Sequence, residues 1–273
     1  MKKSLLASIL SMLLLSILSG CGGNNDTPTT TGTKYFAYVA NSVSNNVSAY
    51  SIDSVTGALT AVAGSPFAAG VTPVSVTVDP TGKYAYVANM NTLNVSVYSI
   101  NSATGALTAT AGSPFAAGLR PSSVTLDPTG RFAYVANENS ANVTAYSIDA
   151  ATGVLAPVAG SPFAAGAGPS SVTVDPTGRF AYVANATSGN ISAFAINAAT
   201  GALSPIAGSP FAAGISPSAV TVDPTGKFAY VVNKTSNNVF AYSINSATGA
   251  LTTITGSPFA AGTNPSSIVT VRR

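Results

Sequence analysis

Residues 127–137 are Asp-Pro-Thr-Gly-Arg-Phe-Ala-Tyr-Val-Ala-Asn, which joins a turn signature to an apolar run. Asp127 can accept hydrogen bonds from the turn, the Pro after it presets φ, and Gly130 suits a left-handed backbone position. The run Phe-Ala-Tyr-Val-Ala is apolar on both faces, which is typical of a strand with neighbours above and below it. The stretch therefore predicts a tight hairpin that leads into a buried strand.

This stretch belongs to a repeat. The repeats carry Asp-Pro-Thr-Gly from Asp79, Asp127, Asp175 and Asp223, and Gly-Ser-Pro-Phe-Ala-Ala-Gly from Gly64, Gly112, Gly160, Gly208 and Gly256. Ala-Tyr-Val-Ala-Asn begins at Ala37, Ala85, Ala133 and Ala181, and at Ala229 with Val232 in place of the second Ala. Each copy starts 48 residues after the last, and residues 34–273 number 240, or five times 48. The chain therefore predicts five equivalent structural units.

One period predicts four antiparallel strands. In the second period these are Ser75–Asp79, Tyr84–Ala88, Val95–Ile100 and a fourth strand that begins near Ala106. Gly112–Gly118 is too long for a tight hairpin, so it is interpreted as the crossover to the next unit. Four strands per period of 40–50 residues are typical of a β-propeller blade. A single sheet that is apolar on both faces has to stack on its neighbours.

The quoted motifs carry a more specific resemblance. Tyr-Val-Ala-Asn, the Asp-Pro-Thr-Gly hairpin and Gly-Ser-Pro-Phe-Ala-Ala-Gly resemble the YVTN-repeat propellers and the related propeller-fold lactonase family, over nearly all of residues 34–273. The resemblance implies an all-β propeller of four-stranded blades, in a family whose members are commonly seven-bladed. This chain has five copies.

The ends of the repeat region predict how the ring closes. The region begins at a second strand, Phe36–Ala40, and ends at Ile268–Val271, in the place of a first strand. We expect the C-terminal strand to pair with the N-terminal strands, because closure removes exposed edges. The final Val-Thr-Val comes one residue later than in the other copies, so a bulge or register shift has to absorb the difference.

The N-terminus has the pattern of a secretory leader. Met1-Lys2-Lys3 precedes the apolar run 5–18, whose length as a helix is about 21 Å, short of a hydrocarbon core of about 30 Å. Leu18-Ser-Gly-Cys21 resembles the bacterial lipobox, so residues 1–20 are interpreted as a lipoprotein signal peptide. An ordinary signal peptide with an incidental Cys is the alternative.

Residues 21–33 are then the lipidated Cys21 and a flexible tether rich in Gly, Thr and Asn. This organisation predicts a protein held at a membrane by its N-terminal lipid. It would lie in the bacterial cell envelope, outside the cytoplasm, and at the outer membrane if the host is Gram-negative.

The composition argues against several classes of binding site and catalytic site. Charged residues are 7% of the chain, against roughly 25% in ordinary soluble domains. Without Lys2 and Lys3 the chain has 9 basic and 8 acidic residues, a net charge of +1, which argues against nucleic acid as a partner. With one Cys and no His, the sequence predicts neither a structural zinc site nor Cys–His catalysis, and we expect no metal and no cofactor.

The repeats differ mainly in two kinds of loop. The first-to-second hairpin and the third-to-fourth turn are nearly invariant, whereas the second-to-third loops and the crossovers vary and should share the opposite rim. In repeat proteins the face that varies often binds partners. The candidate contact residues are Met90, Leu93, Arg120, Glu138 and Lys234. Drift in loops that have no function is the alternative explanation.

Three functions are compatible with this pattern. The leading interpretation is a noncatalytic, lipid-anchored propeller that presents its variable face to an unknown protein or carbohydrate at the cell surface. The resemblance implies a lactone hydrolase, and the family is associated with His, Arg and Glu in its cleft. Here only Glu138 as base and Arg120 as oxyanion partner could serve. A structural repeat protein of the envelope is the third possibility.

Overall fold

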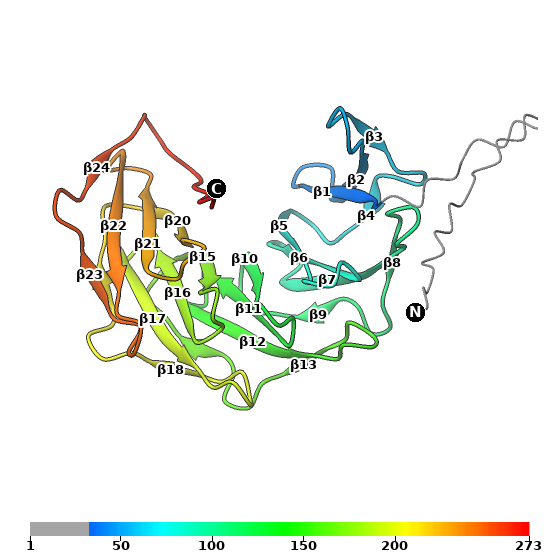
Figure 1. The fold of residues 1–273 in the computed structure, drawn as a ribbon. Helices are drawn as coiled ribbons and strands as arrows, with labels where there is room; N and C mark the ends of the chain where they lie inside the picture. Colours follow the sequence, from blue (N-terminus) through cyan, green and yellow to red (C-terminus); the bar gives the residue numbers. More distant parts are fainter. Residues whose placement is uncertain (1–32, 273) are drawn as a thin grey trace, which may run out of the picture. The chain divides into compact units, whose positions relative to one another are not determined.

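The computed structural model describes residues 33–272. The expected signal peptide, the expected lipidation site at Cys21 and almost all of the expected tether lie outside these residues. Within Lys34–Arg273, which forms one compact unit, the described residues fold into five antiparallel sheets that follow one another along the chain (Figure 1). We call these sheets blades 1 to 5.

Blade 1 has four strands and each of the other blades has five. Blade 1 holds β1 (Tyr35–Asn41), β2 (Asn46–Ile52), β3 (Leu59–Ala61) and β4 (Phe67–Ala68). Blade 2 holds β5 (Pro73–Val78), β6 (Tyr84–Asn89), β7 (Asn94–Ile100), β8 (Leu107–Ala109) and β9 (Phe115–Ala116). Blade 3 holds β10 (Pro121–Leu126), β11 (Phe132–Asn137), β12 (Asn142–Ile148), β13 (Leu155–Pro157) and β14 (Phe163–Ala164). Blade 4 holds β15 (Pro169–Val174), β16 (Phe180–Asn185), β17 (Asn190–Ile196), β18 (Leu203–Pro205) and β19 (Phe211–Ala212). Blade 5 holds β20 (Pro217–Val222), β21 (Phe228–Asn233), β22 (Asn238–Ile244), β23 (Leu251–Thr253) and β24 (Phe259–Ala260).

The all-β fold, the repeated blade and the 48-residue period are as the sequence predicts. One element differs, because the Gly-Ser-Pro-Phe-Ala-Ala-Gly segment is not only a crossover. Its Phe-Ala pair forms a two-residue strand that pairs with the third strand of its own blade, as β9 does with β7. The chain therefore leaves each blade only after this short strand.

The hairpin of residues 127–132 shows why the turn signature recurs. Asp127 is 5% exposed, and its Oδ1 accepts hydrogen bonds from the amides of Arg131 and Phe132, both at 2.7 Å. Its Oδ2 accepts from the amide and the hydroxyl of Thr129. Gly130 has a φ of 70°, which favours glycine. The four hairpin Asp side chains thus serve their own turns, and the residues described here contain no cluster of three or more metal-ligating side chains.

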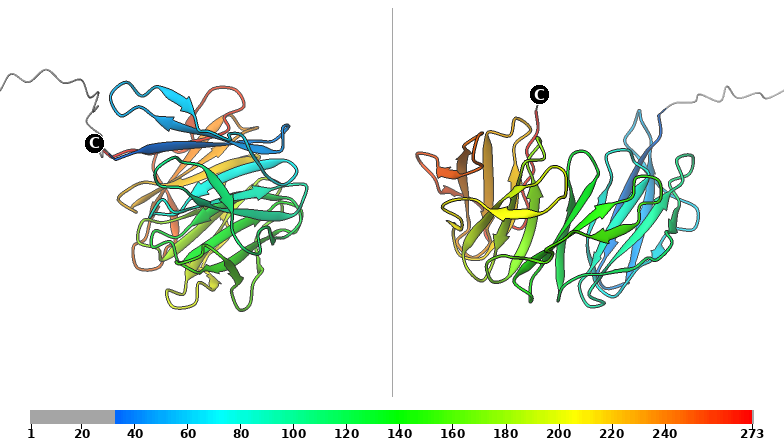
Figure 2. Two further views of the ribbon diagram at one scale, coloured as in Figure 1. Left: turned by 90° about the vertical axis from the view of Figure 1, so that its right-hand side faces the viewer. Right: turned by 90° about the horizontal axis from the view of Figure 1, so that it is seen from below.

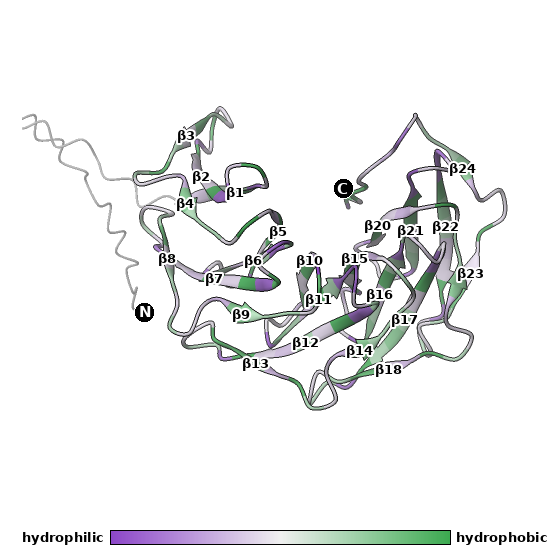
Figure 3. Ribbon diagram, turned by 180° about the vertical axis from the view of Figure 1, so that it is seen from behind, coloured by the Kyte–Doolittle hydropathy of each residue, from purple (hydrophilic) through white to green (hydrophobic). Residues whose placement is uncertain are grey.

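The core lies between the blades. Five sheets enclose four apolar layers, one at each junction, and each layer includes a fully buried Tyr or Val from a second strand. Apolar and polar segments alternate along β7 and β12 (Figure 3). Successive side chains point to opposite faces, so each of these strands contributes to two core layers, as Val97 and Tyr98 of β7 do. The inner strands β5, β10, β15 and β20 contact one another in succession.

The predicted closure of the ring is wrong. Residues 264–272 form no strand, and no hydrogen bond within the described part of the chain joins them to blade 1. They lie along β20 instead, where the Ser218 hydroxyl donates to Pro265 O (3.2 Å) and the Thr270 hydroxyl to Val222 O (3.3 Å). Blades 1 and 5 lie at opposite ends of the series of sheets (Figure 2). The reason is that the four equivalent junctions together do not turn the series of blades far enough to bring β1 beside residues 265–271.

Candidate functional site

The variable loops lie on one rim, as the sequence predicts. In each of blades 2 to 5 the first residue after the second strand donates its amide to the crossover that precedes the blade. Glu138 N donates to Arg120 O at 2.9 Å, and Lys234 N donates to Ser216 O at 2.9 Å. The same bonds join Met90 to Thr72 and Ala186 to Gly168. These bonds hold the two kinds of variable loop together.

A pocket of about 310 Å³ opens on this rim. Its lining comes from the second-to-third loops and from the beginnings of the inner strands β10, β15 and β20. The lining residues are Met90, Ser122, Glu138, Ser170, Ala186, Ser216, Pro217, Ser218 and Lys234. Three of the five predicted candidates, Met90, Glu138 and Lys234, therefore line one pocket.

The other two candidates lie differently. The Nε of Arg120 is 3.3 Å from Oε2 of Glu138, and both side chains are about 40% exposed (41% and 38%). Arg120 does not line the pocket, so it contacts the pocket only through Glu138. An ion pair this exposed contributes at most about 1 kcal/mol to stability. Leu93 lies at the other end of its loop and lines no part of the pocket.

Serine hydroxyls form a part of the pocket that the sequence analysis missed. Ser122 Oγ lies 2.7 Å from Pro169 O and 3.2 Å from Ala136 O, and Ser170 Oγ lies 2.7 Å from Pro217 O. Each hydroxyl has one proton, which goes to a main-chain carbonyl, so its oxygen can still accept from a ligand. The signal for these residues was a Ser that recurs directly after the crossover Pro.

The pocket therefore combines one carboxylate, one ammonium group and several hydroxyl oxygens. Glu138 is the only Glu of the chain, and Lys234 is the cation among the lining residues. A carboxylate can accept a proton from water, an ammonium group can stabilise a developing oxyanion, and serine oxygens can accept from sugar hydroxyls. The described residues include no helix long and apolar enough to cross a membrane.

The comparisons with known proteins agree with this architecture. The family model described as lactonase, 7-bladed beta-propeller, matches residues 33–163 and 156–269. The chain belongs to this lactonase family. The family's description counts seven blades, whereas the described residues of this member form five.

Solved structures share the fold of this lactonase-family chain. A proposed 6-phosphogluconolactonase from Bacteroides uniformis matches with a TM-score of 0.73 and 22% identity, over 85% of this chain and 70% of the other. The periplasmic gluconolactonase of Pseudomonas aeruginosa matches with a TM-score of 0.73 and 20% identity, over 88% of this chain and 70% of the other. No curated protein matches the chain. At these identities the likeness concerns the fold alone.

Proposed function

We propose that this chain is a lactone hydrolase and that the pocket lined by Glu138 and Lys234 is its active site. The observation that carries the proposal is that the only Glu of a charge-poor chain lines a pocket together with a Lys, on the rim where the repeats differ. Membership of the lactonase family favours this function over the noncatalytic surface module, which the comparisons do not support.

The pocket supplies groups for each step of lactone opening. The Glu138 carboxylate takes a proton from water while the water oxygen bonds to the lactone carbonyl carbon. Lys234 stabilises the oxyanion that forms on the carbonyl oxygen. The bond between that carbon and the ring oxygen then breaks, and the proton held by Glu138 passes to the leaving alkoxide. The product is the open hydroxy acid.

The structure changes the role that we assign to Arg120. The sequence suggested an oxyanion partner, but Arg120 does not line the pocket and its guanidinium contacts Glu138. We therefore assign it as a positioning residue that fixes the carboxylate. Lys234 takes over the place of the oxyanion partner.

A lactonase assay on the purified protein tests this proposal. Glucono-δ-lactone and its 6-phosphate are supplied as substrates, and acid release is followed against the buffer background. We expect turnover that Glu138→Gln lowers by at least about a hundredfold. Asp149→Asn, which changes an exposed carboxylate in a turn, and Lys227→Gln, on the hairpin rim, are the matched controls. Absence of turnover, or full activity of Glu138→Gln, would contradict the proposal.

We also propose that the protein acts outside the cytoplasm, held at a membrane by a lipid on Cys21. Two observations support this: the apolar leader ends at a lone Cys, and a structural neighbour is described as periplasmic. A soluble sugar lactone in the envelope would then be the substrate, with no requirement for a protein or carbohydrate partner at the surface.

A further inference from the structure

The two end blades each expose a face that the interior blades bury. Five sheets enclose only four apolar layers, so one face of blade 1 and one face of blade 5 have no partner within residues 33–272. Phe228 of blade 5 is 37% exposed, whereas its equivalents Phe132 and Phe180 are each 5% exposed. Terminal units of soluble repeat proteins usually present a polar outer face. These end blades present the apolar side chains of an interior blade.

All four junctions use the same pair of contacts. The aromatic ring at the start of a second strand covers the glycine of the third-to-fourth turn in the next blade, so closely that a Cβ there would overlap the ring. Two residues further along, a Tyr hydroxyl donates to the carbonyl of the same glycine, as Tyr134 does to Gly201 at 3.0 Å. The ring and glycine pairs are Phe36 with Gly105, Tyr84 with Gly153, Phe132 with Gly201, and Phe180 with Gly249.

The fifth ring and the fifth glycine have no such partners. In blade 5, Phe228 and Tyr230 stand in the positions of the ring and the Tyr, but no further blade follows them within the described residues. In blade 1, Gly57 has the same left-handed φ of 72°, and a Cβ placed on it would meet nothing within 4 Å. The outer faces of blades 5 and 1 are therefore the two halves of one more junction of the same kind.

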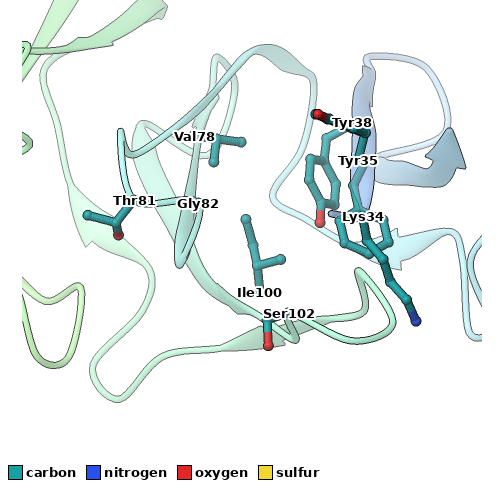
Figure 4. Close-up of a pocket in the computed structure, with 9 residues that line it drawn as sticks. Lys34, Tyr35, Tyr38, Val78, Thr81, Gly82, Ile100 and Ser102 are labelled. Atoms are coloured by element: carbon teal, nitrogen blue, oxygen red, sulfur yellow. The ribbon is translucent and has the colours of Figure 1, made fainter. Parts of the chain in front are cut away.

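The inner strands show the same complementarity. Blade 1 lacks an inner strand, and beside β1 a pocket of about 340 Å³ remains. Tyr35 and Tyr38 lie on one side of this pocket, and Val78 and Gly82 lie on the other (Figure 4). Conversely, residues 265–271 lie beside β20 as an inner strand would, but they have no second strand to pair with.

The repeat gives the register of this missing pair. In blade 2, Val76 pairs with Val87. Pro265 and Ile268 lie 192 residues (four times 48) after Pro73 and Val76, so counting from the Pro that opens the strand places Ile268 at the position of Val76, although the final Val-Thr-Val comes one residue later. Val39 lies 48 residues before Val87, so Ile268 would pair with Val39. Val39 is 46% exposed, whereas Val87, Val135 and Val183 are fully buried.

A hydrogen bond that recurs between neighbouring inner strands is also missing where blade 1 has no inner strand. Val124 N donates to Ser75 Oγ at 3.2 Å, and the bonds from Val172 to Ser123 and from Val220 to Ser171 repeat it. The next position of the series is Ala219, which has no hydroxyl, and the one after it is Ser267. The amide of Val76 is the donor left over at the other end of the series.

We propose that copies of this chain associate head to tail, so that blade 5 of one copy packs against blade 1 of the next. Residues 265–271 of the first copy then form the inner strand beside β1 of the second. This contact joins two different surfaces, which allows further copies to add. A second copy can cover the exposed faces of blades 1 and 5 while every junction keeps its packing. Closure within one chain would instead require the packing of the four junctions to change.

Disulfide trapping tests the register between copies. The full chain with Cys21→Ala serves as the background, and one variant carries Val39→Cys while a second carries Ile268→Cys. We expect the mixture to form a disulfide-linked heterodimer under mild oxidation, several-fold faster than Val39→Cys mixed with Val271→Cys, which is exposed but out of register. Equal rates in the two mixtures overturn the proposal. So does a double variant that forms its disulfide within one chain at all concentrations.

Mass measurements test the packing of the end blades. Sedimentation of the Cys21→Ala chain should show a mass above the monomer that rises with protein concentration. Phe228→Glu should shift this association to at least about tenfold higher concentration. Leu119→Glu, which charges another exposed apolar side chain away from the end faces, should leave the association unchanged. A monomer at all concentrations, or association unaffected by Phe228→Glu in a folded variant, overturns the proposal.

Discussion

Arg120 and Glu138 are joined twice, once through the main chain and once through their side chains. The Glu138 amide donates to the Arg120 carbonyl at 2.9 Å, and the Arg120 guanidinium meets the Glu138 carboxylate at 3.3 Å. The first bond recurs in the other complete blades, whereas the second is found at this position alone among the described residues. The loop is therefore placed by the repeat, and the carboxylate is oriented by a residue specific to this copy.

This arrangement predicts the effect of Arg120→Ser on catalysis. Ser216 occupies the equivalent position with the same φ of 55°, so the substitution suits the backbone and keeps the main-chain bond. We expect kcat for lactone hydrolysis to fall about ten- to hundredfold with little change in KM, because the carboxylate loses its orientation and no substrate contact is removed. Steady-state kinetics measure the effects on kcat and KM separately. A rise in KM with unchanged kcat would show that Arg120 binds substrate instead.

Leu93 offers a stabilising substitution. Its φ of 57° is unfavourable for Leu, and Asn45 and Asn237 take the equivalent positions in blades 1 and 5. Asn45 Oδ1 accepts from Thr72 N at 2.8 Å and Asn237 Oδ1 from Asn264 N at 2.7 Å. Leu93→Asn should gain the same bond from Arg120 N and relieve the backbone. We expect about 1 kcal/mol of added stability and a Tm higher by about 2–4 °C. An unchanged or lower Tm in thermal melts would refute this account.

The junction glycines predict a contrast between two equivalent substitutions. Gly153 and Gly57 have φ values of 73° and 72°, but a Cβ on Gly153 would overlap the ring of Tyr84 while one on Gly57 meets nothing within 4 Å. In both Gly→Ala variants the left-handed φ is unfavourable for Ala, which lowers the free energy of unfolding by about 1 kcal/mol. Only Gly153→Ala also overpacks a junction, which lowers the free energy of unfolding by about a further 1–3 kcal/mol. Urea unfolding in dilute solution measures both, and equal losses would show that the ring moves freely aside.

Buried tyrosines predict a loss of stability at high pH. Burial raises the pKa of Tyr146 to about 12 and that of Tyr38 to about 12, above the value of about 10 for an unfolded chain. The folded state therefore favours the neutral phenol, and its stability is complete below pH 10 and decreases as the pH rises toward 12. Tyr146→Phe should make this decrease smaller, by up to about 1 kcal/mol for each pH unit.

Phe194 takes the place of Tyr146 in blade 4, so the Phe ring is already accommodated at this position. The free energy of unfolding in urea at pH 8 and near pH 11 provides the measurement. The same pH slope for the variant and the parent chain would contradict the assignment.

The membrane anchor is tested apart from the fold. Cys21→Ala removes the thiol on which the lipid would be placed, so the variant should leave the membrane fraction and appear as soluble protein. Fractionation with detection of the chain decides this, and Ser19→Ala is the control. A Cys21→Ala variant that stays in the membrane fraction would show that the chain is held there by other means.

The sequence by itself determined the repeat, the strands and the scaffold rim. The spacing of Asp127 and Gly130 fixed the hairpin, because a carboxylate that accepts four local hydrogen bonds and a left-handed glycine are local requirements. The same comparison of copies brought Met90, Glu138 and Lys234 forward as candidates on one rim. A one-dimensional period was enough for these inferences, since each unit contacts only its neighbours.

Only the tertiary structure decided how the ends relate and which candidates meet. The sequence of Ile268–Val271 has the pattern of an inner strand, but whether it reaches β1 depends on the angle added at each junction. That angle results from side-chain packing such as Tyr84 on Gly153, and periodicity carries no information about it. For the same reason the contact of Arg120 with Glu138, the serine oxygens of the pocket and the unpaired faces of blades 1 and 5 emerged only in three dimensions.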